Sequence, residues 1–226
     1  MSKRLCAFVA VLTCLSTPAW AQHRAEAGFS LGYTFLDGVS GTAVLAPDGN
    51  TYNRIDPKDS FKWGLNFGVN VNDNVQVGFM FTQAPSKLQL GGTATRDVGD
   101  WSITTYHGYF EYDMGEHDAK IRPYFLGGFG ATNFGEVNYT RINPLATGQT
   151  TGTVPSTTKF SSTWGVGVKA YLKPNIGVRV GFGWTPTYVK SDPGGWWCDP
   201  YWGCYLTGNA QYSNAVDLMG GITFRF

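Results

Sequence analysis

The sequence predicts an all-β protein, an eight-stranded antiparallel up-and-down β-barrel that crosses a membrane. Three observations predict this fold. The 226 residues include 30 glycines, with 15% aromatic and only 15% charged residues, a composition typical of β proteins. Eight segments alternate apolar and polar residues, as half-buried strands do. The connections between these segments alternate between long and short, as in a barrel with two different ends.

Composition also excludes several classes of protein. With 42% hydrophobic residues the chain is not disordered, and a formal net charge of +1 does not favour binding to nucleic acid. Beyond the first twenty residues there is no run of eighteen apolar residues, so we expect no transmembrane helix.

The N-terminus predicts export. Lys3 and Arg4 form a basic start, and a short apolar stretch follows over 5–15. The small residues Ala19 and Ala21 then precede a cleavage point. This order is typical of a signal peptide, and the apolar stretch is too short for a membrane anchor. We therefore expect a signal peptide over 1–21 and a mature barrel over 22–226.

The cysteines fit the same compartment. Cys6 and Cys14 would leave with the signal peptide, so the mature chain keeps Cys198 and Cys204. An even pair in an oxidising compartment predicts a disulfide, and the small ring it closes is worth roughly 2 kcal/mol. The three histidines are scattered, so we expect no metal at this pair and no cofactor.

The first two predicted strands each have one apolar face. The first carries Phe29, Leu31, Tyr33 and Phe35. The second carries Phe61, Trp63, Leu65, Phe67, Val69 and Val71, and a tight turn follows at Asp73-Asn74. The residues between these apolar positions are small, polar or charged, which indicates a second, different face.

The next three strands are predicted over 75–81, 101–113 and 120–134. The alternation is less regular in the fourth. We place Glu111 inward there, together with His107 and Tyr109, which turns Phe110 and Tyr112 outward.

The last three strands alternate clearly. The sixth carries Trp164, Val166, Val168, Ala170 and Leu172, and the seventh carries Ile176, Val178, Val180, Phe182 and Trp184. The eighth carries Val216, Leu218, Gly220, Ile222, Phe224 and Phe226. Several segments reach the length that a tilted strand needs to cross a bilayer.

The long connections are 38–59, 84–100, 135–159 and 190–210, and the short ones are 73–74, 114–119 and 173–175. Short turns at one end and long loops at the other are typical of a bacterial outer-membrane barrel. We therefore expect four extracellular loops.

Charge decides which face points inward. A Lys or Arg facing lipid at mid-bilayer costs about 2–4 kcal/mol, so the charged rows should face the lumen. Because buried charges must be paired, we predict a lumenal charge network. Its expected members are Glu26, Lys62, Glu111, Arg122, Lys169, Arg179 and Asp217.

Three local motifs add a family resemblance: Arg122-Pro123-Tyr124, the glycine-rich 127–130 and the closing 222–226. With the predicted signal peptide and eight strands, the chain resembles the small outer-membrane barrels that include the transmembrane domain of outer-membrane protein A. The resemblance implies that Phe224 and Phe226 form the signal read by the barrel-assembly machinery. It further implies that the protein is a monomer among outer-membrane lipid and lipopolysaccharide.

Some members carry a second, soluble domain that grips peptidoglycan, whereas this sequence ends at Phe226. We therefore do not expect a cell-wall-tethering role. Small barrels of this architecture serve as anchors, adhesins, narrow pores and lipid-modifying enzymes, so the fold alone does not assign an activity.

The most unusual segment is the last long connection. It holds a disulfide candidate and a set of aromatic side chains: Trp196, Trp197, Tyr201, Trp202 and Tyr205. These could form a platform for sugars or lipid headgroups. The alternative is that they belong to the aromatic girdle at the outer membrane interface or pack as a lid over the barrel mouth, since Trp and Tyr favour that depth.

We expect a non-enzymatic barrel that acts through structure, anchoring or surface contact. The alternative is a narrow channel for small solutes. Two further alternatives are weaker. A lipid-modifying enzyme would need a partner for His107, and a secreted lipocalin-like binder would turn its apolar rows inward.

Overall fold

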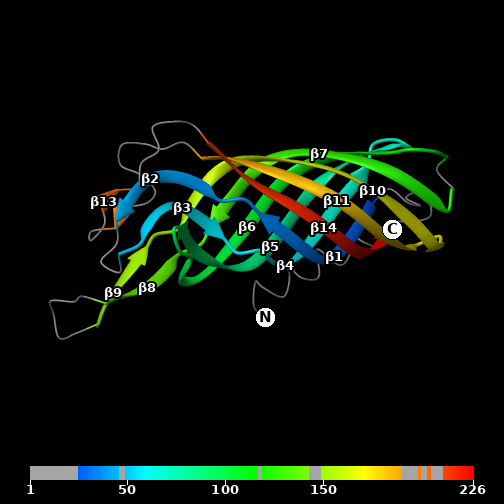
Figure 1. The fold of residues 1–226 in the computed structure, drawn as a ribbon. Coiled ribbons are helices and arrows are strands. Elements are labelled where there is room, and N and C mark those ends of the chain that lie inside the picture. Colours follow the sequence, from blue (N-terminus) through cyan, green and yellow to red (C-terminus); the bar gives the residue numbers. More distant parts are fainter. Residues whose placement is uncertain are drawn as a thin grey trace, which may run out of the picture.

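The computed structural model describes residues 25–45, 49–116, 119–142, 149–189, 198–199, 203–204 and 211–226. Eight antiparallel strands close into a barrel (Figure 1). They are β1 (Ala25–Leu36), β4 (Ser60–Asn70), β5 (Val75–Gly92), β6 (Arg96–Asp113), β7 (Ile121–Phe134), β10 (Thr157–Lys173), β11 (Ile176–Val189) and β14 (Gln211–Arg225). The predicted fold class is confirmed.

Pairing of the first strand with the last closes the barrel. In the β1–β14 ladder Glu26 lies opposite Arg225 and Leu36 lies opposite Ala215. β1 pairs with β4 on its other side, where Thr34 lies opposite Ser60. Each barrel strand therefore has two neighbours, which satisfies the backbone polar groups that lipid cannot. Among the described residues no helix is long and apolar enough to cross a membrane.

The outer surface of the barrel is apolar. Phe67 is 54% exposed, Leu218 56% and Val180 58%, and the other predicted apolar rows are exposed in the same way. An exposed apolar area of this extent is stable in lipid and not in water. The apolar rows point outward, which excludes the lipocalin-like alternative.

The two ends of the barrel differ, and we call them the turn end and the loop end. The turn end holds both chain termini of the barrel and the short connections at 71–74, 114–120 and 174–175. There the Asn74 side-chain amide donates hydrogen bonds of 2.8 Å to the carbonyls of Asp113 and Gly115. Gly115 has a φ of 96°, a backbone conformation that favours glycine.

The loop end is more regular than the sequence predicts. The expected connection 84–100 is instead a continuation of β5 and β6, each of 18 residues, around a short turn at 93–95. Pro85 obscures this in the sequence because proline lacks a ladder donor. In the structure Pro85 lies opposite Ser102 of β6 on one side of β5. On the other side it lies between the residues that pair with β4 and those that pair with β3 (Thr51–Pro57), where β5 has no ladder partner.

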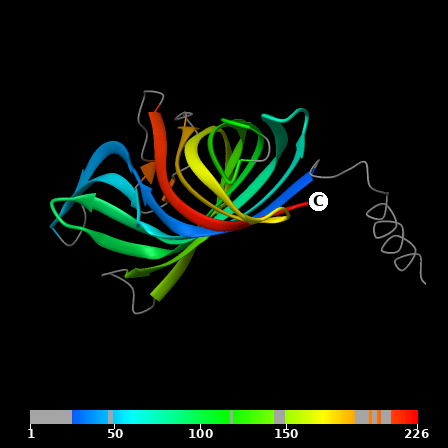
Figure 2. The same cartoon turned by 90° about the vertical axis from the view of Figure 1, so that its right-hand side faces the viewer.

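Two further hairpins extend the same end. β2 (Val39–Leu45) pairs with β3, and β8 (Val137–Ile142) pairs with β9 (Gln149–Val154). The expected loops 38–59 and 135–159 therefore contain strands. Figure 2 shows β2, β3 and the β5–β6 hairpin projecting from one end of the barrel.

One ion pair joins this projection to the end of β1, and a second lies within β3. Arg54 of β3 pairs through Nη2 with Asp37 at 2.8 Å and through Nε with Asp56 at 2.5 Å. The hydrogen bond that Arg54 Nε donates to Asp56 is the main cause that raises the pKa of the Arg54 guanidinium, which therefore stays charged. Exposed pairs of this kind add little stability.

The projection has its own apolar core. A cluster of buried side chains, which we call the loop-end cluster, comprises Ile55, Leu88, Trp101, Ile103, Phe134 and Val137. Trp101 and Phe134 stack with ring centroids 5.3 Å apart, and the Trp101 indole donates to the Gly135 carbonyl at 2.8 Å. The loop end is thus a folded β structure with a packed interior.

Candidate functional site in the barrel lumen

The lumen is where the inward rows of all eight strands meet. Lys169 lies at the centre of its turn end and is 0% exposed. Its Nζ lies 3.0 Å from Glu26 Oε1 and 3.3 Å from Asp113 Oδ2, and it also contacts Glu111 Oε1. One ammonium therefore bridges three carboxylates that come from β1 and β6.

Each of these carboxylates has an arginine as well. Arg179 Nη2 donates to Glu111 Oε2 at 3.0 Å, and Arg225 Nε donates to Glu26 Oε2 at 3.4 Å. Arg122 Nη1 lies 3.5 Å from Asp113 Oδ2. Because every charge has an opposite partner, the cost of burying it is compensated by attraction and hydrogen bonds.

Tyrosine rings complete this layer. The Arg179 guanidinium lies 4.7 Å from the centroid of the Tyr124 ring, and that of Arg225 lies 3.5 Å from the Tyr171 ring. The Tyr171 hydroxyl donates to Glu26 Oε2 at 3.0 Å. Cations over aromatic faces are stabilised when water is excluded. We call the four cations and three carboxylates of this layer the charge network: Glu26, Glu111, Asp113, Arg122, Lys169, Arg179 and Arg225.

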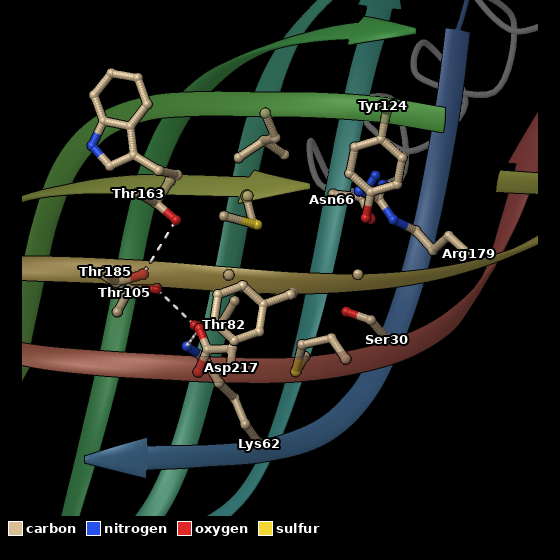
Figure 3. A pocket seen from close by; sticks show the side chains of 18 of the residues that line it. Ser30, Lys62, Asn66, Thr82, Thr105, Tyr124, Thr163, Arg179, Thr185 and Asp217 are labelled. Atoms are coloured by element: carbon tan, nitrogen blue, oxygen red, sulfur yellow. Dashed lines mark hydrogen bonds and ion pairs between the residues drawn. The ribbon is translucent and has the colours of Figure 1, made fainter. Parts of the chain in front are cut away.

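A second, separate ion pair lies further towards the loop end. Lys62 Nζ donates to Asp217 Oδ2 at 2.7 Å, and both side chains are buried. Figure 3 shows this pair beside a lumenal cavity of about 80 Å³, with Arg179 and Tyr124 also on its wall. Hydroxyl pairs line the same cavity, Thr82 with Thr105 at 2.6 Å and Thr185 with Thr163 at 3.2 Å.

The structure also gives His107 a partner that the sequence did not indicate. His107 Nε2 lies 2.9 Å from Ser161 Oγ, which accepts a 2.9 Å hydrogen bond from Thr132. Both His107 and Ser161 are 0% exposed, and His107 Nδ1 has no hydrogen-bond partner among the described residues. A catalytic pair needs an orienting group and access for substrate, so this contact fits lumenal packing better than catalysis.

The described part of the chain contains no group of three or more potential metal ligands. The structure places all seven predicted lumenal charges inside the barrel, but it divides them. Five belong to the charge network, whereas Lys62 and Asp217 form their own pair. Asp113 and Arg225 were missed as network members. Asp113 lies two residues from Glu111 on the same inward row, which could have indicated it.

Several predicted residues fall outside the described part of the chain: Ala19, Ala21, Trp196, Trp197, Tyr201, Trp202 and Tyr205. The backbones of Cys198 and Cys204 are described and lie opposite one another in the ladder of β12 (Cys198–Asp199) and β13 (Gly203–Cys204). Directly opposed residues of antiparallel strands have a Cα separation that a disulfide can bridge. The disulfide stays a prediction.

The predicted assembly signal lies at the barrel seam. Phe224 lies opposite Ala27 in the β1–β14 ladder, and the Phe226 amide donates to the Ala25 carbonyl at 2.9 Å. Both phenyl rings are exposed on the outer surface. The geometry leaves both rings accessible, and whether the assembly machinery reads them stays a prediction.

A closed antiparallel barrel with an apolar outer belt and paired charges inside defines an integral β-barrel membrane protein. The comparison with protein families agrees, because the model described as the outer membrane protein beta-barrel domain matches residues 7–201. The chain therefore belongs to this family of outer-membrane proteins. Among curated proteins, none matches the sequence significantly.

Solved structures share the fold at low sequence identity. Neisserial surface protein A is 12% identical with a TM-score of 0.52, and the match covers 89% of this chain and 96% of that chain. OprG from Pseudomonas aeruginosa is 13% identical with a TM-score of 0.52, covering 91% and 98%. The outer membrane protein AlkL is 12% identical with a TM-score of 0.52, covering 93% of each. These likenesses show the fold.

Proposed function

We propose that the protein is a non-enzymatic, non-conducting barrel that anchors a folded extracellular projection at the cell surface and acts there through structure or contact. The observation that carries this proposal is the charge network across the lumen. Four cations and three carboxylates from six strands meet there with little space between them.

The network supports a plug because a conducting path would need its charges to separate. Lys169 and Glu111 are 0% exposed. If the two charges moved apart, each would lose its ionic partners while it was still shielded from water. Removing one partner of a buried pair leaves an uncompensated charge, which is strongly unfavourable. The closed state is therefore favoured over an open one, as expected of an anchor.

The loop end supports a role at the surface. The β5–β6 hairpin continues beyond the apolar belt, and at about 3.4 Å per residue its outer half projects by roughly 30 Å along the strand. A packed core holds the hairpin in place. The predicted aromatic platform and disulfide in 190–210 would add to the surface that this projection presents.

The remaining partners follow from the same proposal. Export with cleavage after Ala21, recognition of Phe224 and Phe226 by the assembly machinery, and a monomer in lipid and lipopolysaccharide are its expected steps. The exposed apolar rows supply the lipid contact. No nucleic acid, metal or cofactor enters this proposal.

Conductance of the refolded mature chain in a planar bilayer tests the proposal. We expect silence after insertion has been verified by heat-dependent migration in gels. The Lys169→Ala and Arg179→Ala variants probe the network, and Lys173→Ala, an exposed lysine at the turn end, is the matched control. Steady conductance of the unmodified protein that both network variants alter, and the control does not, would overturn the plugged barrel.

One observation favours the second candidate, a narrow channel. The cavity of about 80 Å³ is lined by Lys62 and Arg179, two cations that could line a path for small anionic solutes. The same recording decides between the candidates, because a channel gives discrete steps whose ion selectivity changes in Arg179→Ala.

A further inference from the structure

Each buried charge of the lumen has an opposite partner, but the numbers of positive and negative charges differ. Among the described residues the charge network holds four cations and three carboxylates, and Lys62 with Asp217 adds one of each. Asp73, whose carbonyl accepts a hydrogen bond from Arg122, is exposed at the turn end and is not one of these buried charges. The buried part of the lumen therefore carries one positive charge in excess, which is unfavourable without a counter-charge.

The larger lumenal cavity borders this excess charge. Its volume is about 80 Å³, and its wall includes Arg179 and the Tyr124 ring that lies against the Arg179 guanidinium. Glu111, the carboxylate that accepts from Arg179, is not part of the wall. A water molecule needs only about 10–15 Å³ of such volume, so the cavity has room for a small ion and part of its hydration shell.

The two ends of this cavity differ in charge. Figure 3 shows Asn66, Tyr124 and Arg179 on one side of the cavity and Lys62 with Asp217 on the other. The register agrees, because Asn66 follows Lys62 by four residues on β4. Arg179 lies opposite Gly221, four residues from Asp217 on β14. Four residues span about 13 Å of strand, so Asp217 neutralises Lys62 and not Arg179.

The Arg179 end also holds a hydrogen-bond donor without an acceptor. Asn66 is 9% exposed, and its Nδ2 atom has no hydrogen-bond partner among the described residues. Ser30 of β1 lines the same cavity and carries a hydroxyl that can donate as well. A buried N–H group without an acceptor is unfavourable, and an anion is a strong acceptor.

We propose that the lumen binds one small monovalent anion, such as chloride, between Arg179 and Asn66. Arg179 supplies the positive charge, Asn66 Nδ2 donates a hydrogen bond, and the Ser30 hydroxyl is the third donor. This proposal rests on the non-conducting barrel proposed above and deepens it, because an anion that stays bound supplies the negative charge that the plug lacks.

The chemistry of the wall selects this class of ligand. Water would satisfy Asn66 but would leave the excess positive charge, and a cation would add to that charge. A doubly charged anion would exceed it. At the other end of the cavity Lys62 already has Asp217, whose carboxylate repels an anion. A small monovalent anion at the Arg179 end therefore matches both the charge and the volume.

Unfolding of the full mature chain in different salts tests the proposal. The barrel is refolded into vesicles, and its urea midpoint is followed by tryptophan fluorescence at constant ionic strength while sodium gluconate is replaced by sodium chloride. Gluconate is too large for the cavity. A ligand that binds only the folded state stabilises it, so chloride at roughly one hundred times its dissociation constant should raise the folding equilibrium constant about 100-fold.

The variants separate the donor from the charge. Asn66→Leu removes the donor and should weaken chloride binding by about tenfold or more. Asn66→Asp has the same shape but supplies a negative charge, so its midpoint in gluconate should equal or exceed that of the unmodified protein and should not respond to chloride. The matched control is Asn133→Leu, because Asn133 donates to Thr158 away from the cavity wall; this variant should keep the full response to chloride.

Bromide locates the anion directly. Crystals of the unmodified protein grown in sodium bromide should show an anomalous peak between Arg179 and Asn66, and crystals of Asn66→Asp should not. If Asn66→Leu does not fold, Ser30→Ala is the milder variant and must still weaken chloride binding.

Two results would overturn the anion site. One is a midpoint of the unmodified protein that is the same in chloride and in gluconate, and the other is an Asn66→Asp variant that is less stable than the unmodified protein in gluconate. A silent barrel without a response to chloride refutes the site and leaves the proposed function standing. A barrel that responds to chloride and also conducts keeps the site and refutes the function.

Discussion

Replacing Lys169 with methionine removes the cation that three carboxylates share and keeps the length of the side chain. Breaking a buried ion pair by removing one partner costs about 3–5 kcal/mol. Here Glu26, Glu111 and Asp113 each keep one arginine within 3.5 Å, so none is left without an opposite charge. We therefore expect a loss near the lower limit, about 3 kcal/mol in the free energy of unfolding.

The assay is urea unfolding of the refolded barrel in vesicles, followed by tryptophan fluorescence. A lower midpoint with an unchanged slope reports lost stability alone. The exposed Lys173→Met is the control and should leave the midpoint unchanged. The double variant adds Glu111→Gln, which removes a carboxylate that Lys169 contacts. Its loss in the free energy of unfolding should be smaller than the sum of the two single losses by more than about 1 kcal/mol. A loss below about 1 kcal/mol for Lys169→Met, or full additivity, would refute the shared-cation reasoning.

Three further predictions concern the wall, the outer face and the exported chain. A methyl group in Gly181→Ala would overlap the Tyr124 hydroxyl and should cost about 1–3 kcal/mol in the same urea assay, whereas Gly220→Ala, whose methyl would meet one atom at 4.0 Å, should be nearly neutral. Val166→Lys places a charge towards lipid and should cost about 2–4 kcal/mol, whereas Val166→Leu should not. Intact mass spectrometry of the exported protein should show a chain beginning at Gln22 in which Cys198 and Cys204 do not react with a thiol reagent unless reduced.

The strands and the inward charges could be predicted because each rests on a local pattern. An alternation of period two fixes the two faces of a strand, and the cost of a charge in lipid decides which face points inward. Lys169 and Arg179 were assigned to the lumen in this way without any knowledge of their partners. The structure then adds that they lie opposite one another in the β10–β11 ladder.

The grouping of the charges could not be predicted, because it depends on register between strands far apart in sequence. Lys62 and Asp217 are separated by 155 positions, and only closure of the barrel brings them within 2.7 Å. The contact of His107 with Ser161, across 54 positions, has the same origin. The alternation along one strand gives the face to which a side chain points, but it does not give the register, and so not the residues of other strands that the side chain meets.

Reading both rows of one strand together locates where that strand leaves the bilayer. Along β6 the inward row changes from charged to apolar, from Glu111 through Thr105 to Ile103, as the strand approaches the loop end. The outward row changes in the opposite sense, from the exposed Phe110 to Asp100, whose side chain is 92% exposed.

This inversion has a physical cause. Inside the bilayer the outer face must be apolar, and the lumen can hold paired charges; beyond it the outer face meets water, and the interior becomes an ordinary apolar core. The continuation of β5 shows the same exchange, with Phe79 outward in the belt but Lys87 outward and Leu88 inward in the projection. The exchange of polarity between the two rows, and not the first proline or glycine, therefore marks the membrane boundary in such a sequence.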